Sequence, residues 1–195
     1  ITFRPRMMVN CLDLNLSVDV LGVPLFAPII VGPVADQGRF HADGELATVR
    51  GASAARAAVV VSSRSSQRVQ AMAAQATTPL LFQVFGGDGT TAIRSQAQDA
   101  ERAGCRAVLL TIGAPSAGAR RSARIDWTAV DALRDAVSVP VLVKGAMTAR
   151  EATTVRRCRR SSNPVSSIAG RVRPVSANGR RRGPANPTEA SARQA

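Results

Sequence analysis

The sequence is poor in several residue types on which protein sites often depend. Its 195 residues include no Tyr, one Trp, one His and three Cys, and aromatic residues make up 3% of the chain. The cysteines, Cys11, Cys105 and Cys158, lie far apart and show neither the spacing of metal ligands nor that of a disulfide framework. We therefore expect no metal site, and a reducing, cytoplasmic setting for the protein.

Long apolar runs are also missing. No apolar stretch reaches the roughly 18 residues that a membrane-spanning helix needs, and the first residues lack the pattern of a signal peptide. We therefore expect no membrane association. Residue 1 is Ile rather than Met, from which we expect the sequence to be part of a longer reading frame. With 45% hydrophobic residues, the chain can still form one domain with a sizeable core.

Acidic residues are scarce in one part of the chain only. A formal net charge of +13 suggests a nucleic-acid partner, but residues 154–195 hold 10 of the 26 Arg and Lys residues and only one of the 13 Asp and Glu residues. The excess charge therefore belongs to this tail and not to the part that we expect to fold. The tail also lacks aromatic residues on which bases stack, so we expect no nucleic-acid partner.

The chain does contain a series of short apolar runs, each followed by a segment with helical spacing. A period-2 alternation over residues 12–20 predicts an edge strand or a hairpin before Gly22. Such an alternation of runs predicts a parallel α/β protein, either an open doubly wound sheet or a (β/α)8 barrel. We expect strands over residues 28–32, 57–61, 79–85, 107–112 and 139–144, and helices over residues 44–57, 65–75, 91–103, 126–137 and from 149.

Two acidic residues mark the start of the first helix. Asp43 precedes the helix and is expected to cap it. Glu45 lies in the first turn, where a negative charge is stabilised by the helix dipole. The loop between the first strand and this helix therefore ends at Asp43.

Polar residues follow the apolar runs at the ends of four expected strands. These residues are Ser62, Gln83, Thr111 and Lys144. Active sites of βα barrels lie at the carboxyl ends of the strands, and no Gly-x-Gly-x-x-Gly follows any strand, so the pattern favours the barrel over a dinucleotide-binding sheet. Each polar residue also fits a simple strand end, although a lysine directly after Val-Leu-Val is best explained by a cleft.

The apolar pattern ends after about Thr153. Residues 154–195 are rich in Arg, Ser, Pro, Gly and Ala, show no further strand, and bury too little apolar surface to offset the entropy of ordering, so we predict a disordered tail. A shifted reading frame would give such a composition, and the other two frames of the coding DNA test this hypothesis. A complete barrel needs about eight strands, so residues 1–153 are expected to form an incomplete TIM barrel of about five βα units. Its open strand edges predict self-association.

Eight short motifs stand near the expected strand ends. They are Phe3-Arg4-Pro5-Arg6, Ala27-Pro28-Ile29, Gly32-Pro33-Val34-Ala35, His41-Ala42-Asp43-Gly44-Glu45, Val61-Ser62-Ser63, Phe82-Gln83-Val84-Phe85, Leu110-Thr111 and Leu142-Val143-Lys144-Gly145. In their order and spacing they resemble the FMN-dependent α-hydroxy-acid oxidases and dehydrogenases, such as glycolate oxidase and lactate oxidase. The resemblance covers roughly residues 1–153 and implies an oxidoreductase that uses FMN and a small 2-hydroxy acid.

The resemblance also implies roles for individual residues in binding the flavin. The segment whose backbone would lie against the flavin ring is Pro33, Val34 and Ala35. The residues that would hydrogen-bond the polar edge of the ring are Ser62, Gln83 and Thr111. Lys144 matches a lysine beside flavin N1, where a fixed cation stabilises negative charge on the reduced flavin.

Two further residues match positions that contact the substrate. Arg120 matches an arginine that holds the substrate carboxylate, for which a bidentate guanidinium is suited, although Arg120 also fits a solvated loop charge. Phe85 stands where the family has a Tyr, so a hydroxyl near the substrate is lost. Gly113 stands where the family has an Asp that pairs with the catalytic base.

The catalytic base itself has no counterpart in the sequence. The family has a His in a Ser-Asn-His-Gly context after the sixth strand, where the spacing from Lys144 places Ile168. The single histidine, His41, belongs to the loop after the first strand and is expected to be a loop or helix-cap residue. We therefore assign no catalytic residue and expect the chain to be inactive as a hydroxy-acid oxidoreductase.

Two other functions remain open. One is a non-catalytic binding fragment whose basic tail holds an acidic partner or RNA, which a filter-binding titration at two salt concentrations tests. The other is a different phosphate-binding TIM-barrel enzyme, which flavin absorbance in the purified protein would exclude.

Overall fold

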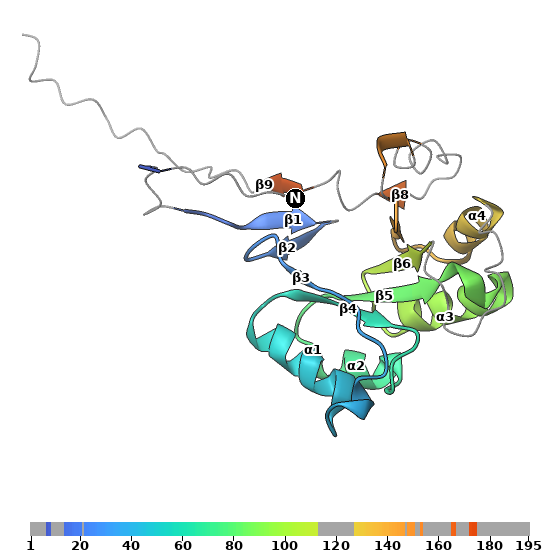
Figure 1. Cartoon of the computed structure of the whole chain (residues 1–195), viewed down its shortest axis with the longest axis horizontal. Coiled ribbons are helices and arrows are strands. Elements are labelled where there is room, and N and C mark those ends of the chain that lie inside the picture. The colour runs from blue at the N-terminus through green and yellow to red at the C-terminus, as the bar shows by residue number, and fades with distance from the viewer. Residues whose placement is uncertain are drawn as a thin grey trace, which may run out of the picture.

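The computed structural model describes residues 7–8, 14–20, 22–112, 127–146, 148–150, 153, 165–166 and 172–174. These residues form a six-stranded sheet of order β3-β4-β5-β6-β7-β8 and a three-stranded sheet of order β2-β1-β9 (Figure 1). Every pair of neighbouring strands in the larger sheet is parallel. Its strands are β3 (Ile30–Val31), β4 (Ala58–Ser62), β5 (Leu80–Phe85), β6 (Ala107–Thr111), β7 (Val141–Lys144) and β8 (Val165–Ser166).

A helix follows each of the strands β3 to β6. The helices are α1 (Gly44–Ala54), α2 (Val69–Gln75), α3 (Thr90–Arg102) and α4 (Trp127–Ala136), and two 3-10 turns are η1 (Gln37–Arg39) and η2 (Gly86–Asp88). The expected alternation of strands and helices is thereby confirmed, with element ends that differ by a few residues. The curled parallel sheet is a partial TIM barrel, so the predicted fold class is confirmed as well.

The central strands have two buried faces, because successive side chains of a strand point to opposite sides. One face packs against the helices, where Val61, Val84 and Leu110 join a core with Met72 and Ile93. The other face, called the inner face below, forms a separate apolar cluster. Its strand residues are Ala58, Val60, Leu81, Ala107, Leu109 and Leu142. Burial on both sides explains why β4 and β6 are continuous apolar runs up to their last residue.

An antiparallel hairpin covers one end of the inner face. The hairpin consists of β1 (Val18–Val20) and β2 (Val23–Leu25). An edge strand or a hairpin was expected before Gly22, and the observed hairpin has its second strand after that residue. Val18 and Leu25 pack against the inner-face cluster, in which Ala58 and Ala107 are the first residues of their strands. The hairpin therefore closes the amino ends of the strands, on the side of the sheet away from the helices (Figure 1).

Two short strands occur in the segment in which the sequence showed none. β8 pairs with β7 in parallel, with Val141 opposite Val165, and β9 (Val172–Pro174) pairs with β1. The expectation that no strand follows Thr153 is therefore wrong at these residues, and of the expected open strand edges that of the last expected strand, residues 139–144, is paired. The edges of β1 and β7 offer unpaired backbone groups that any short extended segment can satisfy. The other residues of 154–195 lie outside the described part, so the domain division at residue 153 stays a prediction.

The first helix begins differently from the expectation. Asp43 is the residue before α1, but its side chain makes no capping hydrogen bond, and its carboxylate pairs with Arg50 instead. Asp43 already has helical backbone angles, with φ of −81° and ψ of −12°, whereas a capping side chain normally needs an extended backbone. The predicted cap is therefore wrong, while Glu45 does lie in the first turn.

Within the described residues, no helix combines the length and the apolar character needed to cross a membrane.

Candidate functional site

The polar strand ends lie on one edge of the inner face. Each follows an inner-face apolar residue two positions earlier in the same strand, and side chains two apart share a face. The pairs are Val60 and Ser62, Leu81 and Gln83, Leu109 and Thr111, and Leu142 and Lys144. The inner face therefore changes from apolar to polar at the carboxyl ends of four neighbouring strands, where the barrel fold places active sites.

The strand register brings the predicted residues next to one another. Ser62 lies opposite Gln83, and Thr111 lies opposite Phe85 on one side and Lys144 on the other. Gln83 Nε2 donates a hydrogen bond of 2.7 Å to Thr111 Oγ1, and both side chains are 5% exposed. Because Thr111 accepts this bond, its hydroxyl proton can still be donated to a ligand.

Ser62 has a similar arrangement on the neighbouring strand. Its Oγ accepts a hydrogen bond of 3.1 Å from the backbone amide of Arg64 and is buried. The amide of Ser63, the residue after Ser62, donates to the carbonyl of Gln83 over 2.8 Å and continues the hydrogen bonding between β4 and β5 beyond the end of β4. The hydroxyl of Ser62 is therefore held in place by the backbone and keeps its proton for a further acceptor.

Lys144 supplies a cation at the other side of the polar edge. It is the last residue of β7 and is exposed, and within the described residues no acidic group forms an ion pair with it. Its carbonyl accepts the amide of Ile112 over 2.9 Å. Gly145 follows with φ of +115°, and a Cβ there would lie 2.4 Å from the Ile112 carbonyl oxygen, so only glycine permits this close approach of the strand ends.

The segment after β3, which contains Pro33, Val34 and Ala35, is fixed on the next strand-end loop. The amide of Asp36 donates to the carbonyl of Arg64 over 3.1 Å. The side chain of Gln37 donates to the carbonyl of Val34 over 3.1 Å. The segment therefore runs beside the Ser62 end of β4, as its predicted role beside the same ligand requires.

Phe85 has a neighbour that the sequence analysis did not single out. The guanidinium carbon of Arg64 lies 3.9 Å from the centroid of the Phe85 ring, a cation–π contact, and Arg64 Nη2 lies 2.8 Å from Asp88 Oδ1. Phe85 shares the inner-face parity of Gln83, so this arginine stands at the polar edge. The position of Arg64 two residues after Ser62, in a strand-end loop, was the available signal.

Arg120 and Gly113 lie outside the described residues, so the substrate role of Arg120 stays a prediction.

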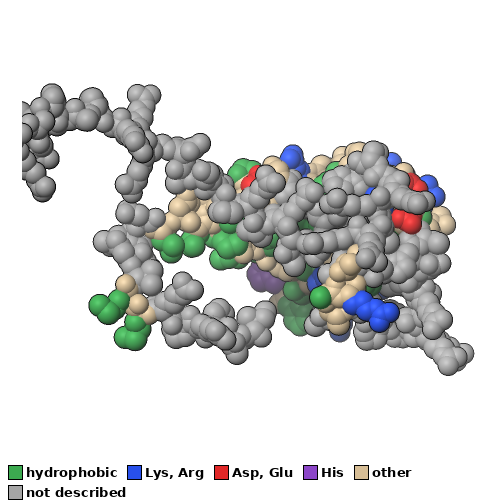
Figure 2. All heavy atoms as spheres, turned by 90° about the horizontal axis from the view of Figure 1, so that it is seen from above, with side chains coloured by type: hydrophobic (Ala, Val, Ile, Leu, Met, Phe, Trp, Pro, Cys, Tyr) green, Lys and Arg blue, Asp and Glu red, His purple; other side chains and the backbone are tan. Residues whose placement is uncertain are grey.

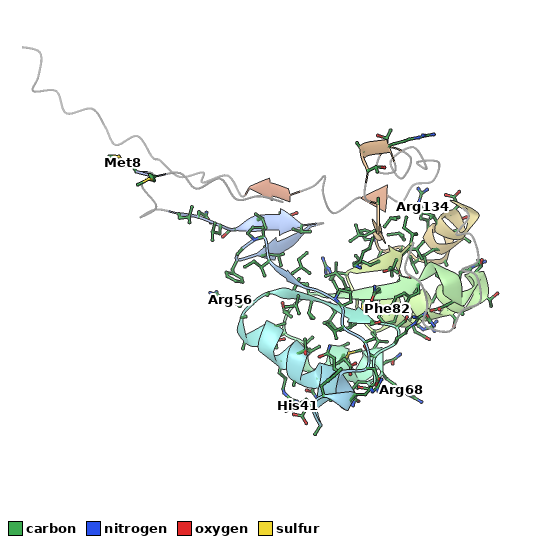
Figure 3. The ribbon with its side chains drawn as sticks, viewed as in Figure 1. Met8, His41, Arg56, Arg68, Phe82 and Arg134 are labelled. Atoms are coloured by element: carbon green, nitrogen blue, oxygen red, sulfur yellow. The ribbon has the colours of Figure 1, made fainter. Side chains whose placement is uncertain are left out.

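The single histidine lies in the loop that leads into α1. His41 is exposed, and its Nδ1 accepts a hydrogen bond of 3.1 Å from the amide of Asp43. Figure 3 shows His41 at the start of α1, away from Phe82 within the sheet. The interpretation of His41 as a loop or helix-cap residue is therefore confirmed.

Cys105 has no role at this edge. It is 2% exposed, and burial raises the pKa of its thiol to about 12, so the thiol stays protonated near neutral pH. Cys105 packs in the helix-side core. Within the described part of the chain, no group of three or more His, Cys, Asp or Glu residues could hold a metal ion.

Fold and site together define a partial βα barrel with a buried polar edge at the carboxyl ends of its strands. The profile of the FMN-dependent dehydrogenase family matches residues 1–124, and the chain belongs to this family. FMN is the cofactor of the family. The buried Gln83–Thr111 pair and the hydroxyl of Ser62 fit the polar groups of such a ring, and Lys144 fits its negative charge in the reduced state.

Individual relatives agree with this assignment. Glycolate oxidase 3 of Oryza sativa subsp. indica is 30% identical over 193 residues, which cover 77% of this chain and 53% of the relative. A crystal structure of mandelate oxidase with 3,3-difluoro-2-hydroxy-3-phenylpropionic acid has a TM-score of 0.71 and 27% identity, and the match covers 80% of this chain and 52% of that one. A mandelate oxidase variant with a monooxide FMN adduct has a TM-score of 0.69 and 29% identity over similar shares, 80% and 52%. The chain spans about half the length of the curated relatives it matches.

Proposed function

We propose that this chain carries the flavin-ring side of an FMN-dependent oxidoreductase of small 2-hydroxy acids, and that the chain alone does not turn over substrate. The observation that carries the proposal is the buried 2.7 Å hydrogen bond between Gln83 and Thr111, beside Ser62 at the carboxyl edge of the inner face. Relatives named glycolate oxidase and structures named mandelate oxidase supply the class of substrate.

The residues of the polar edge would act by binding and charge. FMN, when bound, supplies the acceptor for the two electrons that leave the substrate α-carbon. Ser62, Gln83 and Thr111 would hydrogen-bond the polar edge of the ring, because their groups are buried and held by the backbone or by one another. Lys144 would stabilise negative charge, since within the described residues no carboxylate neutralises it.

The substrate would lie against the ring of Phe85, with its carboxylate on Arg120. Phe85 offers an apolar surface without a hydroxyl, and Arg64 already covers one side of this ring. A guanidinium is suited to a carboxylate because it can donate two parallel hydrogen bonds.

The absence of turnover follows from the absence of a base. His41 is the single histidine of the sequence and its Nδ1 is occupied by the amide of Asp43 in a turn before α1. A positioned general base contributes about 10²–10⁴-fold to such a reaction, and the described residues of the polar edge include no histidine.

Anaerobic mixing of the purified chain with FMN and glycolate, lactate or mandelate tests the proposal. We expect weak FMN binding, micromolar or poorer, seen as quenching of flavin fluorescence, and no bleaching of the flavin absorbance band. Riboflavin, which lacks the phosphate, is expected to bind as tightly as FMN. The proposed contacts involve the flavin ring alone, whereas a complete eight-stranded barrel binds phosphate with the loops after its last two strands. Bleaching that depends on Lys144, or complete failure to bind any flavin, would contradict the proposal.

Self-association of the chain is part of this proposal. Several large apolar side chains next to the hairpin and β3 are exposed, namely Leu14, Leu16, Phe26 and Ile29. Figure 2 shows hydrophobic side chains on the surface of the protein. Among the described strands, β3 also has a partner on one side only. Light scattering of the purified chain over a range of concentrations tests this, and a monomer at high concentration would contradict it.

A cytoplasmic location stays a prediction; one relative, 25% identical over 191 residues, is by its name a peroxisomal (S)-2-hydroxyacid oxidase of Arabidopsis thaliana. The two alternative functions, a binding fragment with a basic tail and another phosphate-binding barrel enzyme, also stay predictions with the tests given above.

A further inference from the structure

Glu45 is a buried carboxylate to which the proposed function assigns no role. It lies in the first turn of α1 and is 1% exposed. Its Oε1 accepts the backbone amides of Gln37, over 2.9 Å, and of Ser66, over 3.0 Å, and its Oε2 accepts the hydroxyl of Ser66. One side chain therefore binds two segments that are distant in the sequence, residues 33–38 after β3 and residues 63–66 after β4.

The same two segments are also joined directly. The amide of Gly38 donates to Ser66 Oγ over 3.1 Å, so the Ser66 hydroxyl accepts from one segment while it donates to Glu45. Beyond Glu45, the side chain of Gln37 accepts the hydroxyl of Thr48 and donates to the carbonyl of Val34. A continuous hydrogen-bond network thus runs from α1 through Glu45 to the backbone of residues 33–38.

The contact is too close for side chains on two of its members. A Cβ on Gly38 would lie 2.9 Å from Ser66 Oγ, and a Cβ on Gly44 would lie 3.0 Å from both Ser66 Oγ and the Gly38 amide nitrogen. Such distances are below van der Waals contact, so the backbone of α1 and the two loops meet without space between them. This close packing fixes the segment 33–38 and the loop 63–66 relative to each other and to α1.

The charge of Glu45 suits this environment. Burial by itself raises the pKa of Glu45, but the hydrogen bonds from the Ser66 hydroxyl and from the Gln37 and Ser66 amides outweigh it, and the pKa is lowered below its ordinary value. A carboxylate that only accepts hydrogen bonds binds each donor more strongly than a neutral amide would.

We propose that Glu45 is a positioning residue that fixes the segment 33–38 against the loop 63–66 and thereby places the backbone of Val34 and Ala35 beside Ser62. The inference rests on the proposed function in one respect, since flavin binding gives this placement its chemical consequence. The placement itself has a readout that needs no flavin.

Amide hydrogen exchange of the full chain provides that readout. In Glu45→Gln an amide NH2 group, which donates hydrogen bonds, replaces the oxygen that accepts the Ser66 hydroxyl, and the charge is lost, so we expect the amides of Gln37, Gly38 and Ser66 to exchange about tenfold faster or more. Amides of β5 and β6 are expected to keep their protection. The matched control is Asp43→Asn, which makes the same charge change two residues earlier, directly before α1, at an exposed side chain and is expected to leave all these amides unchanged.

A milder variant covers the case in which Glu45→Gln does not fold. Ser66→Ala removes only the hydroxyl and leaves Glu45 with its two backbone amides, so we expect faster exchange at Gly38 with a preserved core. Unchanged exchange at these amides in Glu45→Gln, or equal acceleration in Asp43→Asn, would overturn the proposal. If Glu45→Gln is unfolded, unchanged exchange at Gly38 in Ser66→Ala would overturn it.

Fluorescence titration with FMN separates the placement from its consequence. We expect Glu45→Gln to weaken FMN binding about tenfold and Asp43→Asn to leave it unchanged. Equal FMN binding by the original chain and Glu45→Gln, despite faster amide exchange, would overturn the positioning role. Failure of the original chain to bind FMN would refute the proposed function, and amide exchange alone would then decide the role of Glu45.

Discussion

The two faces of the large sheet are built from alternate residues of the same strands, yet they end differently. On the helix side the strands stay apolar to their ends, with Val61, Leu110 and Val143 buried. On the inner face Ser62, Thr111 and Lys144 end their strands, and on β5 the polar residue is Gln83, two positions before the final Phe85. Because both sets share one backbone, strand formation cannot explain the difference. The helix side serves packing throughout, whereas the inner face serves packing only up to its carboxyl edge, where it is available for chemistry.

The helix-side face is expected to tolerate change least. Leu110 is fully buried between β6 and the helices, and Leu110→Ala is expected to lower the free energy of unfolding by about 2–5 kcal/mol. Urea denaturation followed by circular dichroism measures this loss. A loss below about 1 kcal/mol would mean that the two faces do not differ in packing as described.

The contact between the ends of β6 and β7 is the next most sensitive feature. In Gly145→Ala the new Cβ would lie 2.4 Å from the Ile112 carbonyl oxygen at a φ of +115°, so we expect a loss of about 1–3 kcal/mol. Thermal denaturation beside Gly87→Ala is a suitable measurement, because a Cβ on Gly87 has nothing within 4 Å and no positive φ is recorded there. Equal stability of the two variants would count against the close approach.

The polar edge is expected to separate binding from stability. Gln83→Leu combined with Thr111→Val replaces both partners of a buried hydrogen bond by apolar groups of similar shape, so the free energy of unfolding is expected to change by about 1 kcal/mol or less. Quenching of FMN fluorescence is expected to disappear in the same variant. Retained FMN quenching, or a loss of several kcal/mol in the free energy of unfolding, would contradict this. It would mean that Gln83 and Thr111 contribute to packing, as the residues of the helix-side face do.

The smallest expected effect is the loss of stability at acidic pH that arises from protonation of Glu45. Its pKa is lowered in the folded chain, so its contribution to stability is present above the ordinary carboxyl pKa and is lost as pH falls through the lowered value. Glu45→Gln is expected to remove this part of the pH dependence, in urea denaturation between neutral and acidic pH. An identical pH profile in the variant would contradict the hydrogen-bond assignment.

The strands and the polar edge were predictable from the sequence because both depend on local patterns. β4 and β6 are five-residue runs, buried throughout, whose last residues are Ser62 and Thr111. A run of that kind identifies a strand, and its final residue identifies the edge, before any partner is known.

Contacts between different loops were not predictable in the same way. Arg64, in the loop after β4, contacts Phe85 and Asp88 at the end of the neighbouring strand β5. This contact depends on where a second segment lies in space. The strands β8 and β9 are two and three residues long, too short for any periodicity to reveal them.

The order of the strands has a consequence for how the chain is closed. In the large sheet each strand pairs with the next described strand in the sequence, so every pairing encloses a short stretch of chain. The pairing of β1 with β9 instead joins Val18 to Pro174 and encloses nearly the whole chain. Loop-closure entropy rises with the logarithm of the enclosed length, so this pairing carries the largest entropic cost of any in the two sheets. The pairings of the large sheet thus close short loops at a low entropic cost, whereas the pairing of β1 with β9 closes a long loop and joins segments near the two ends of the described chain.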